Sequence, residues 1–521
     1  MPELAPRSGS SLSLLRLCGS CLVALWFASH PLSAQLRGVF VPLDHPAHSV
    51  AELLVARGAL AGLNGADRPF ALRDLRVAVA AAVGSPTGEI RTLTAADRGR
   101  LEWLRAILGS ATPEGYWAVG LAPEAGVLGA TSAFPELLLP QGDSAAGPAL
   151  RVRAGAEFGP VSLQFEPQRV RNGRARIPVA VARAEWRWGW AQWGEVERNW
   201  GPPGVTGLLI ADIAGSRPEM ALALGPPVLR FEYRLAPLSD GVSSSTGETV
   251  ARYWAMHRLR WRPSPEFEVA LWETALSAEP GGPDAARASP LTPFYFPFQQ
   301  GRLNDRNTAM GLDVSWLMPL GSWVEAQLLV DDIFRDRDPT TEPYPQRYGY
   351  ALQLRGGLGE RHAWRAYTAA LTNLALINRR PEDSFLDDGR PLGRLRPDHR
   401  EAGVLLTTAW GHSTARPVWP GPGVVELGVV WRRQGVRDFA DPWPVLPPGS
   451  PRSPAFSAEI EREVWSLVAE LDWMAGPLTI QSASHAQYRR SPSAGRGWGW
   501  GFEAIVEVNW RIGVLGWTGT G

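Results

Sequence analysis

The chain has 521 residues, and its 52 basic and 52 acidic side chains give a formal net charge of zero. This balance gives no basis for a nucleic-acid partner, which a strongly basic surface would favour. The only two cysteines are Cys18 and Cys21. A disulfide framework, a cysteine zinc site and a thiol nucleophile are therefore excluded from the rest of the chain.

Residues 1–34 have the features of a secretory signal peptide. Arg7 and Arg16 precede the apolar stretch 17–27, and Leu32-Ser33-Ala34 offers a cleavage site. The apolar stretch is too short to cross a bilayer as a helix. No later run reaches the roughly 18 apolar residues that a spanning helix needs. We therefore expect an exported protein that does not cross a membrane with helices.

The next part of the chain carries helical signals. Three helices are predicted within residues 35–112, and they are marked by the capping box of Ser49 and Glu52, the apolar stretch 71–83, and the capping box of Thr94 and Asp97. We expect these helices to form a small periplasmic module, or to block the inner mouth of the domain that follows.

From residue 113 to 521, hydrophobic side chains recur at every second position. The clearest stretch is 498–512, where tryptophans and aliphatic residues alternate with Gly, Glu, Asn and Arg. Successive side chains of a strand point to opposite faces, so each stretch has one apolar and one polar face. The chain also has 24 tryptophans, which suit the aromatic girdles of a membrane barrel.

Loop lengths alternate along the same region. Short links lie around Gly159, Gly321, Gly357 and Gly476, and long links lie near residues 278–307, 334–346, 374–399 and 434–463. Outer-membrane barrels place short turns on the periplasmic side and long loops outside. We therefore predict that residues 113–521 form a transmembrane antiparallel β-barrel of about 18 strands. A secreted sandwich is the alternative, and it would turn the polar faces to bulk water.

The polar strand faces would line the lumen of such a barrel. The charged residues predicted to face the lumen are Arg183, Glu185, Arg187, Glu325, Asp331, Glu503, Glu507 and Arg511. One interpretation is that opposite charges on neighbouring strands pair and make the barrel rigid. The other interpretation is a path for sugars or ions, because arginine forks suit uronic-acid carboxylates and tryptophan rings suit the C–H faces of sugars.

Several segments resemble the Wzi family of capsule-assembly outer-membrane proteins. They are Trp200–Gly204 followed by Leu208–Ile210, the hairpin containing His257–Leu259 and Glu273, and the hairpin of Asn307–Asp313 and Glu325–Asp332. The order of helices followed by a barrel is also similar to that family. The resemblance implies a surface barrel that binds capsular polysaccharide and helps to hold it on the cell, with Trp200 and Glu273 among the candidate ligand-binding residues.

The resemblance implies no enzyme, and no arrangement of Ser and His suggests one. The acidic run Asp331, Asp332, Asp336 and Asp338 is interleaved with Arg335 and Arg337, which would neutralise a calcium site. We predict no catalytic residue, metal or cofactor. The expected partners of a monomer in the outer membrane of a Gram-negative-type cell are surface polysaccharide and membrane lipid. The alternative function is a diffusion porin with no glycan role, and it would need an open lumen.

Overall fold

The computed structural model describes residues 36–520 with some gaps. The gaps are 85–92, 111–115, 132–146, 170–174, 203, 212–214, 282–288, 292–305, 333–343, 394–395, 412–421, 440, 442, 445, 448–449, 451–452, 476–477, 491–497 and 512–514. The predicted signal peptide lies outside the described residues. None of the helices in the described part has the length and hydropathy of a membrane-spanning helix.

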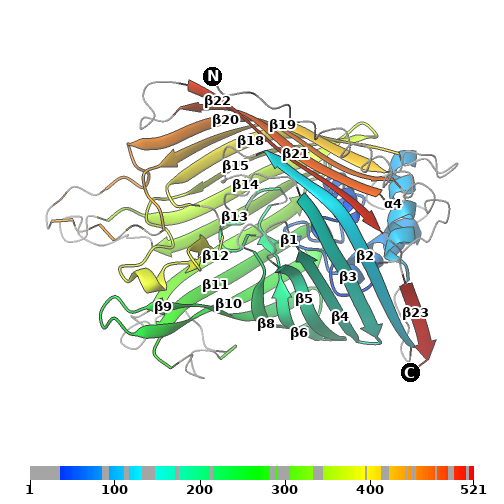
Figure 1. Cartoon of the computed structure of the whole chain (residues 1–521), viewed down its shortest axis with the longest axis horizontal. Coiled ribbons are helices and arrows are strands. Elements are labelled where there is room, and N and C mark those ends of the chain that lie inside the picture. The colour runs from blue at the N-terminus through cyan, green and yellow to red at the C-terminus, as the bar shows by residue number, and fades with distance from the viewer. Residues whose placement is uncertain are drawn as a thin grey trace, which may run out of the picture.

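The strands close into one antiparallel barrel (Figure 1). They are β2 (Tyr116–Thr131), β3 (Gly147–Phe158), β4 (Val161–Arg169), β5 (Ala175–Trp186), β6 (Gly189–Val196), β8 (Arg217–Leu224), β9 (Leu229–Val242), β10 (Thr249–Ser264), β11 (Phe267–Glu279), β12 (Arg306–Leu317), β13 (Ser322–Asp332), β14 (Arg347–Leu358), β15 (His362–Leu371), β18 (His399–Trp410), β19 (Gly423–Gly435), β20 (Ile460–Ala475), β21 (Leu478–Arg490), β22 (Trp498–Arg511) and β23 (Leu515–Thr520). Both β22 and β23 pair with β2, which closes the barrel. Because β22 and β23 pair with successive parts of β2, they count as one strand of the barrel. The barrel therefore has 18 strands, and the predicted count is confirmed.

The loops are sorted by length as predicted. Short links at one end include 159–160 between β3 and β4 and 318–321 between β12 and β13. The links that include residues 280–305 and 436–459 are at the other end. Gly357 lies inside β14, and the short link follows at residues 359–361. We call the two ends of the barrel the short-link end and the long-loop end.

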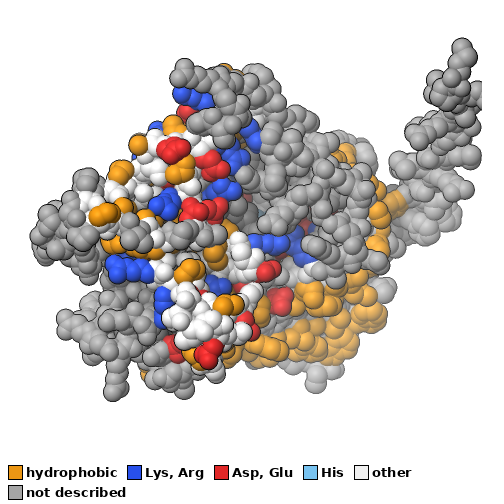
Figure 2. Space-filling view, turned by 60° about the vertical axis from the view of Figure 1, so that its left-hand side comes forward, with side chains coloured by type: hydrophobic (Ala, Val, Ile, Leu, Met, Phe, Trp, Pro, Cys, Tyr) orange, Lys and Arg blue, Asp and Glu red, His pale blue; other side chains and the backbone are white. Residues whose placement is uncertain are grey.

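The outer wall of the barrel is apolar. Large hydrophobic side chains exposed on it include Phe165, Trp193, Met220, Leu259, Leu271, Leu328, Leu352, Val404, Leu427, Leu467 and Val506. Figure 2 shows such side chains gathered on the flank of the barrel at the lower right. The neighbouring positions on the same strands carry buried polar residues such as Gln164, Gln327 and Gln353. Each strand therefore turns its apolar face outward and its polar face to the lumen, as the period-two pattern predicts.

Trp190 departs from the face that the sequence alternation predicts for it. The sequence alternation predicts Trp190 on the outer face together with Trp186. The turn at residues 187–188 breaks the alternation, because Trp190 lies opposite Glu185 in the register of β5 and β6. Trp190 is 7% exposed and lies under the guanidinium of Arg183, so it belongs to the inner face.

Three helices precede the barrel in the described chain: α2 (Pro46–Ala56), α3 (Leu72–Gly84) and α4 (Ala95–Leu108). The cap of α4 is confirmed, since Asp97 N donates to Thr94 Oγ1 at 3.1 Å. The predicted start of α2 at Ser49 is wrong. The helix begins three residues earlier, where Pro46 occupies the first turn and the His45 side chain accepts a hydrogen bond from Ala47 N.

The helices fill the short-link half of the lumen. Their apolar faces share one core with wall residues close to the short links, namely Leu317, Trp323, Ala363, Ala409, Val424 and Met474. Trp323 Nε1 donates to Val55 O of α2 at 2.7 Å, and Arg57 Nη1 donates to Gly359 O and His362 O at 2.8 and 2.9 Å. These contacts place the helices against the wall at the short-link end of the barrel.

Two further segments fill the long-loop half. The inward loop is the stretch between β6 and β8 and carries β7 (Asn199–Trp200). The outer plug is residues 372–393, which include the 3₁₀ turn η4 (Pro381–Asp383), β16 (Leu386–Asp387) and β17 (Arg390–Pro391). Both segments pack in one core with inward side chains of the wall, including Trp254, Trp272, Leu329 and Tyr367. The Ala211 N–H donates to Leu392 O at 2.9 Å and joins the two segments.

Candidate functional site

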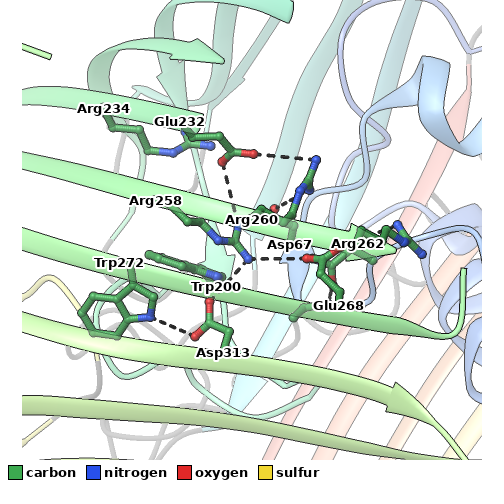
Figure 3. Close-up of polar contacts among 12 residues, drawn as sticks. Asp67, Trp200, Glu232, Arg234, Arg258, Arg260, Arg262, Glu268, Trp272 and Asp313 are labelled. Atoms are coloured by element: carbon green, nitrogen blue, oxygen red, sulfur yellow. Dashed lines mark hydrogen bonds and ion pairs between the residues drawn. The ribbon is translucent and has the colours of Figure 1, made fainter. Parts of the chain in front are cut away.

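A buried charge network joins the barrel wall to the chain inside the lumen (Figure 3). At its centre is Arg258 of β10, whose side chain is 2% exposed. Its Nη1 lies 2.8 Å from Asp67 Oδ2, and its Nη2 lies 3.4 Å from Asp313 Oδ2. Glu232 and Glu268 each approach the same guanidinium to 3.9 Å. One buried cation thus lies among four carboxylates, from three wall strands and one lumen segment.

Asp67 connects the network to the N-terminal part of the chain. It lies in β1 (Asp67–Arg68), which pairs inside the lumen with β7 of the inward loop. Burial by itself raises the pKa of Asp67, but the charges of Arg258 and Arg260 outweigh burial and hold this pKa well below its usual range. Trp200 of β7 lies under Arg258, with 4.5 Å between the guanidinium carbon and the ring centroid. The network therefore fixes both lumen segments to β10.

A small pocket lies beside this network. It has room for about one water molecule, and its lining includes Asn64, Trp200, Glu268 and Gln327. Gln327 closes it from the wall: its Nε2 donates to Trp200 O at 3.2 Å and its Oε1 accepts from Leu208 N at 2.9 Å. A pocket of this size suits water and is too small to pass a polysaccharide chain.

The predicted pair Arg183 and Glu185 faces the lumen and binds the helical module. Arg183 Nε lies 2.7 Å from Glu185 Oε1, and Glu185 Oε2 lies 2.7 Å from Arg73 Nη1 of α3. On the next strands, Glu157 of β3 pairs with Arg76 of the same helix at 2.9 Å. These contacts hold α3 against the wall, which is the pairing that the structural interpretation predicts.

Two predicted acids of β13 also face inward. Glu325 is 1% exposed and lies 2.7 Å from Arg355 Nη2 on the neighbouring strand. Asp331 accepts a hydrogen bond from Leu376 N of the outer plug at 2.9 Å and pairs with Arg347 at 3.3 Å. No group of three His, Cys, Asp or Glu in the described part of the chain is arranged to hold a metal ion.

The structure corrects two of the predicted site residues. Arg187 lies in the turn between β5 and β6, is exposed, and stacks on Trp188 at 5.0 Å, so it does not face the lumen. Glu273 is on the outer wall, since its neighbours Trp272 and Thr274 take the buried inward positions of β11. It pairs there with His257 Nδ1 at 2.9 Å. Arg187 is misplaced because a turn begins there, and the face of Glu273 is set by the register of β11. Neither feature can be predicted from the identity of a single residue.

Residues of β22 are described only in part. Glu503 lies opposite His485 and Arg511 lies opposite Glu124 in the strand register, but their side chains, like those of Trp498 and Trp500, lie outside the described part. Glu507 of the same strand has a described side chain, and its Oε1 lies 3.6 Å from Arg151 Nη2. The predicted ligand role of Glu503 and Arg511 stays a prediction.

The sequence analysis missed a cluster at the long-loop end, which we call the aromatic platform: Tyr344, Arg347, Arg379 and Trp443. The rings of Tyr344 and Trp443 lie 5.1 Å apart at 56°. Arg379 stacks on both rings at 5.4 and 5.9 Å, and Arg347 stacks on Trp443 at 5.3 Å. The residues come from three long loops or their ends, so no local spacing in the sequence could have predicted them.

These features define a closed 18-stranded antiparallel barrel with an apolar outer wall. Its lumen is packed with the helices, the inward loop and the outer plug. No sequence family and no curated protein sequence matches it. A solved structure of Wzi from Escherichia coli, described as an outer-membrane carbohydrate-binding β-barrel involved in group 1 capsule assembly, is similar. It has a TM-score of 0.60 and 11% identity, over 92% of this chain and 100% of that one.

Two structures from Pseudomonas aeruginosa, OccK3 and the outer membrane protein OprD, are less similar. OccK3 has a TM-score of 0.44 at 11% identity, over 77% of this chain and 96% of its own. OprD has a TM-score of 0.43 at 10% identity, over 78% and 96%. The comparison with Wzi shows a shared barrel fold.

Proposed function

We propose that this chain is an outer-membrane barrel that binds capsular or another surface polysaccharide at its long-loop end and helps to assemble or anchor it. In this proposal the apolar wall faces lipid, the long loops face outward, and residues 35–112 lie on the periplasmic side after removal of a signal peptide at 1–34. The protein acts without catalysis or a cofactor.

The observation that carries the proposal is the filled lumen. Side chains that face the axis would be wet in an open channel, yet Gln353, Glu325 and Arg258 are 0%, 1% and 2% exposed. Arg258 pairs instead with Asp67 of a lumen segment, and Glu325 pairs with Arg355 of the neighbouring strand. We expect a barrel filled in this way to conduct poorly and a large ligand to reach it from its ends, which favours the binding role over a diffusion porin.

The solved relative supports the choice of ligand. Wzi shares the barrel fold over most of both chains, and it is described as carbohydrate-binding. At the long-loop end of this chain, exposed arginine and aromatic rings lie together in the aromatic platform, and this combination suits sugars.

Two measurements on the purified full chain test the proposal. In planar bilayers we expect little or no steady conductance, and in a detergent pull-down we expect retention of capsular polysaccharide from encapsulated cells. Large, steady conductance without polysaccharide retention would overturn the proposal in favour of a diffusion porin. Solubility without detergent after export would instead indicate a secreted protein.

A further inference from the structure

The aromatic platform is a rigid surface. Tyr344 and Trp443 pack from above against the core of the long-loop half, which contains Phe385 and Leu392 of the outer plug. Beneath the platform, Arg347 Nη1 donates to Ile377 O at 3.4 Å and pairs with Asp331. Because its base is packed, the platform is preorganised, and a ligand would not have to order it.

Arg379 differs from Arg396 and Arg252 at the same end of the barrel. Arg396 pairs with Asp438 and Glu461 at 3.5 and 3.3 Å, and Arg252 donates to three carbonyl groups of the outer plug. Arg379 is exposed, and its only contacts among the described residues are with the two aromatic rings. Its guanidinium is therefore oriented by stacking while its N–H groups remain available to a ligand.

Trp443 carries a donor that the described structure leaves unpaired. Its Nε1 is buried and has no hydrogen-bond partner in the described structure, although buried indole N–H groups usually find one. The half-buried ring presents an apolar face beside the guanidinium. One platform thus offers an aromatic face and an arginine fork, and of its two cations Arg347 pairs with the carboxylate of Asp331.

We propose that the aromatic platform binds a carboxylate-bearing sugar ring, so that the preferred ligand is an acidic polysaccharide. The sugar C–H face packs on Trp443 and Tyr344, and its carboxylate accepts hydrogen bonds from the fork of Arg379. Planar bidentate pairing of guanidinium with carboxylate supplies the selectivity over neutral sugars. This inference rests on the proposed function and names its ligand class and its site.

The test compares acidic probes with their neutral derivatives. The full chain in detergent is titrated with oligosaccharides of polygalacturonate, alginate and hyaluronate, and with the same oligosaccharides after carboxyl reduction. We expect the wild-type chain to bind at least one acidic oligosaccharide about tenfold or more tightly than its reduced form. Arg379→Gln should remove this preference, while Trp443→Ala should weaken binding of both forms.

Arg390→Gln is the matched control, because Arg390 lies in the same outer plug, loses the same charge, and stacks on neither ring of the platform. It should keep the preference of the wild-type chain. Equal binding of acidic and reduced forms, or an equal effect of Arg379→Gln and Arg390→Gln, would overturn the inference and leave the proposed function standing. If the wild-type chain retains no polysaccharide of any kind, the proposed function itself fails.

Discussion

Asp383 is a buried carboxyl group in the outer plug. Its side chain is 1% exposed, and its Oδ2 lies 2.5 Å from Arg380 Nη2. Its Oδ1 is buried and has no hydrogen-bond partner in the described structure. Burial raises the pKa of Asp383 to about 7, against the opposing charge of Arg380. In the folded protein this group therefore holds its proton over a pH range in which an unfolded chain has lost it.

The sign of the pH effect follows from this difference. Between about pH 4 and pH 7 the folded state binds more protons at Asp383 than the unfolded state does. Its contribution to the free energy of unfolding is therefore complete at low pH and is lost as pH rises through 7. We predict that the wild-type chain loses thermal stability between pH 5 and pH 8, and that Asp383→Asn, which stays neutral, loses less over the same range. Heat-modifiable gel migration at the two pH values measures the difference.

Asp388→Asn is the control for this prediction, since Asp388 is an exposed carboxylate in the same segment. An unchanged pH dependence in Asp383→Asn, or the same change in both variants, would contradict the assignment of this effect to burial of Asp383.

Sequence patterns placed most single residues on the correct face of a strand but could not name their partners. Glu325 and Asp331 face inward as predicted, yet Arg355 and Leu376, which they contact, lie 30 and 45 residues away. Glu273 was misplaced because the family resemblance names a position without giving its face. Alternation is local, whereas a partner depends on register and on which segments enter the lumen.

The ends of a helix could be predicted where a local capping motif sets them. Thr94 caps α4 and Gly109 ends it at a φ of 64°, both as the pattern indicates. The start of α2 was missed because a histidine cap with proline in the first turn is less common than the Ser–Glu capping box. The two lumen segments, 199–211 and 372–393, gave no periodic signal, since their order comes from contacts with six or more wall strands and not from their own sequence.

Arg57 links two helices to the barrel, which makes it a test of the helical module. Its Nε and Nη2 donate to the two oxygens of Asp97 at 2.7 and 3.0 Å, and its Nη1 reaches two carbonyl groups at the β14–β15 turn. We predict that Arg57→Ala loosens α2 and α4 from the wall at a cost of about 1.5–3 kcal/mol, the range for hydrogen bonds to charged groups. Faster amide exchange in both helices should report it.

Arg105→Ala provides the comparison for Arg57→Ala. Arg105 forms an exposed pair with Glu102 at 3.2 Å within α4, and an exposed pair of this kind contributes little. Its removal should leave exchange in α2 unchanged. Similar exchange in the two variants would show that Arg57 does not hold the module.

At the scale of the whole molecule, the lumen is closed at two levels in series. The helices pack against wall residues next to the short links, including Trp323 and Ala363, whereas the inward loop and the outer plug pack against Trp254 and Tyr367 nearer the long loops. When two barriers lie in series, the tighter barrier limits the flow of ions. Opening one level alone should therefore change conductance little.

We predict that deletion of residues 36–109 leaves single-channel conductance low, because the outer plug still fills the long-loop half, although the inward loop loses its pairing with β1. Replacement of 374–392 by a short glycine–serine linker should also leave it low, because the helices remain. Only the double variant should conduct strongly and steadily in planar bilayers, and heat-modifiable migration of each variant would show that its barrel is folded. Strong conductance in either single variant would mean that one segment alone closes the barrel, and the arrangement in series would be wrong.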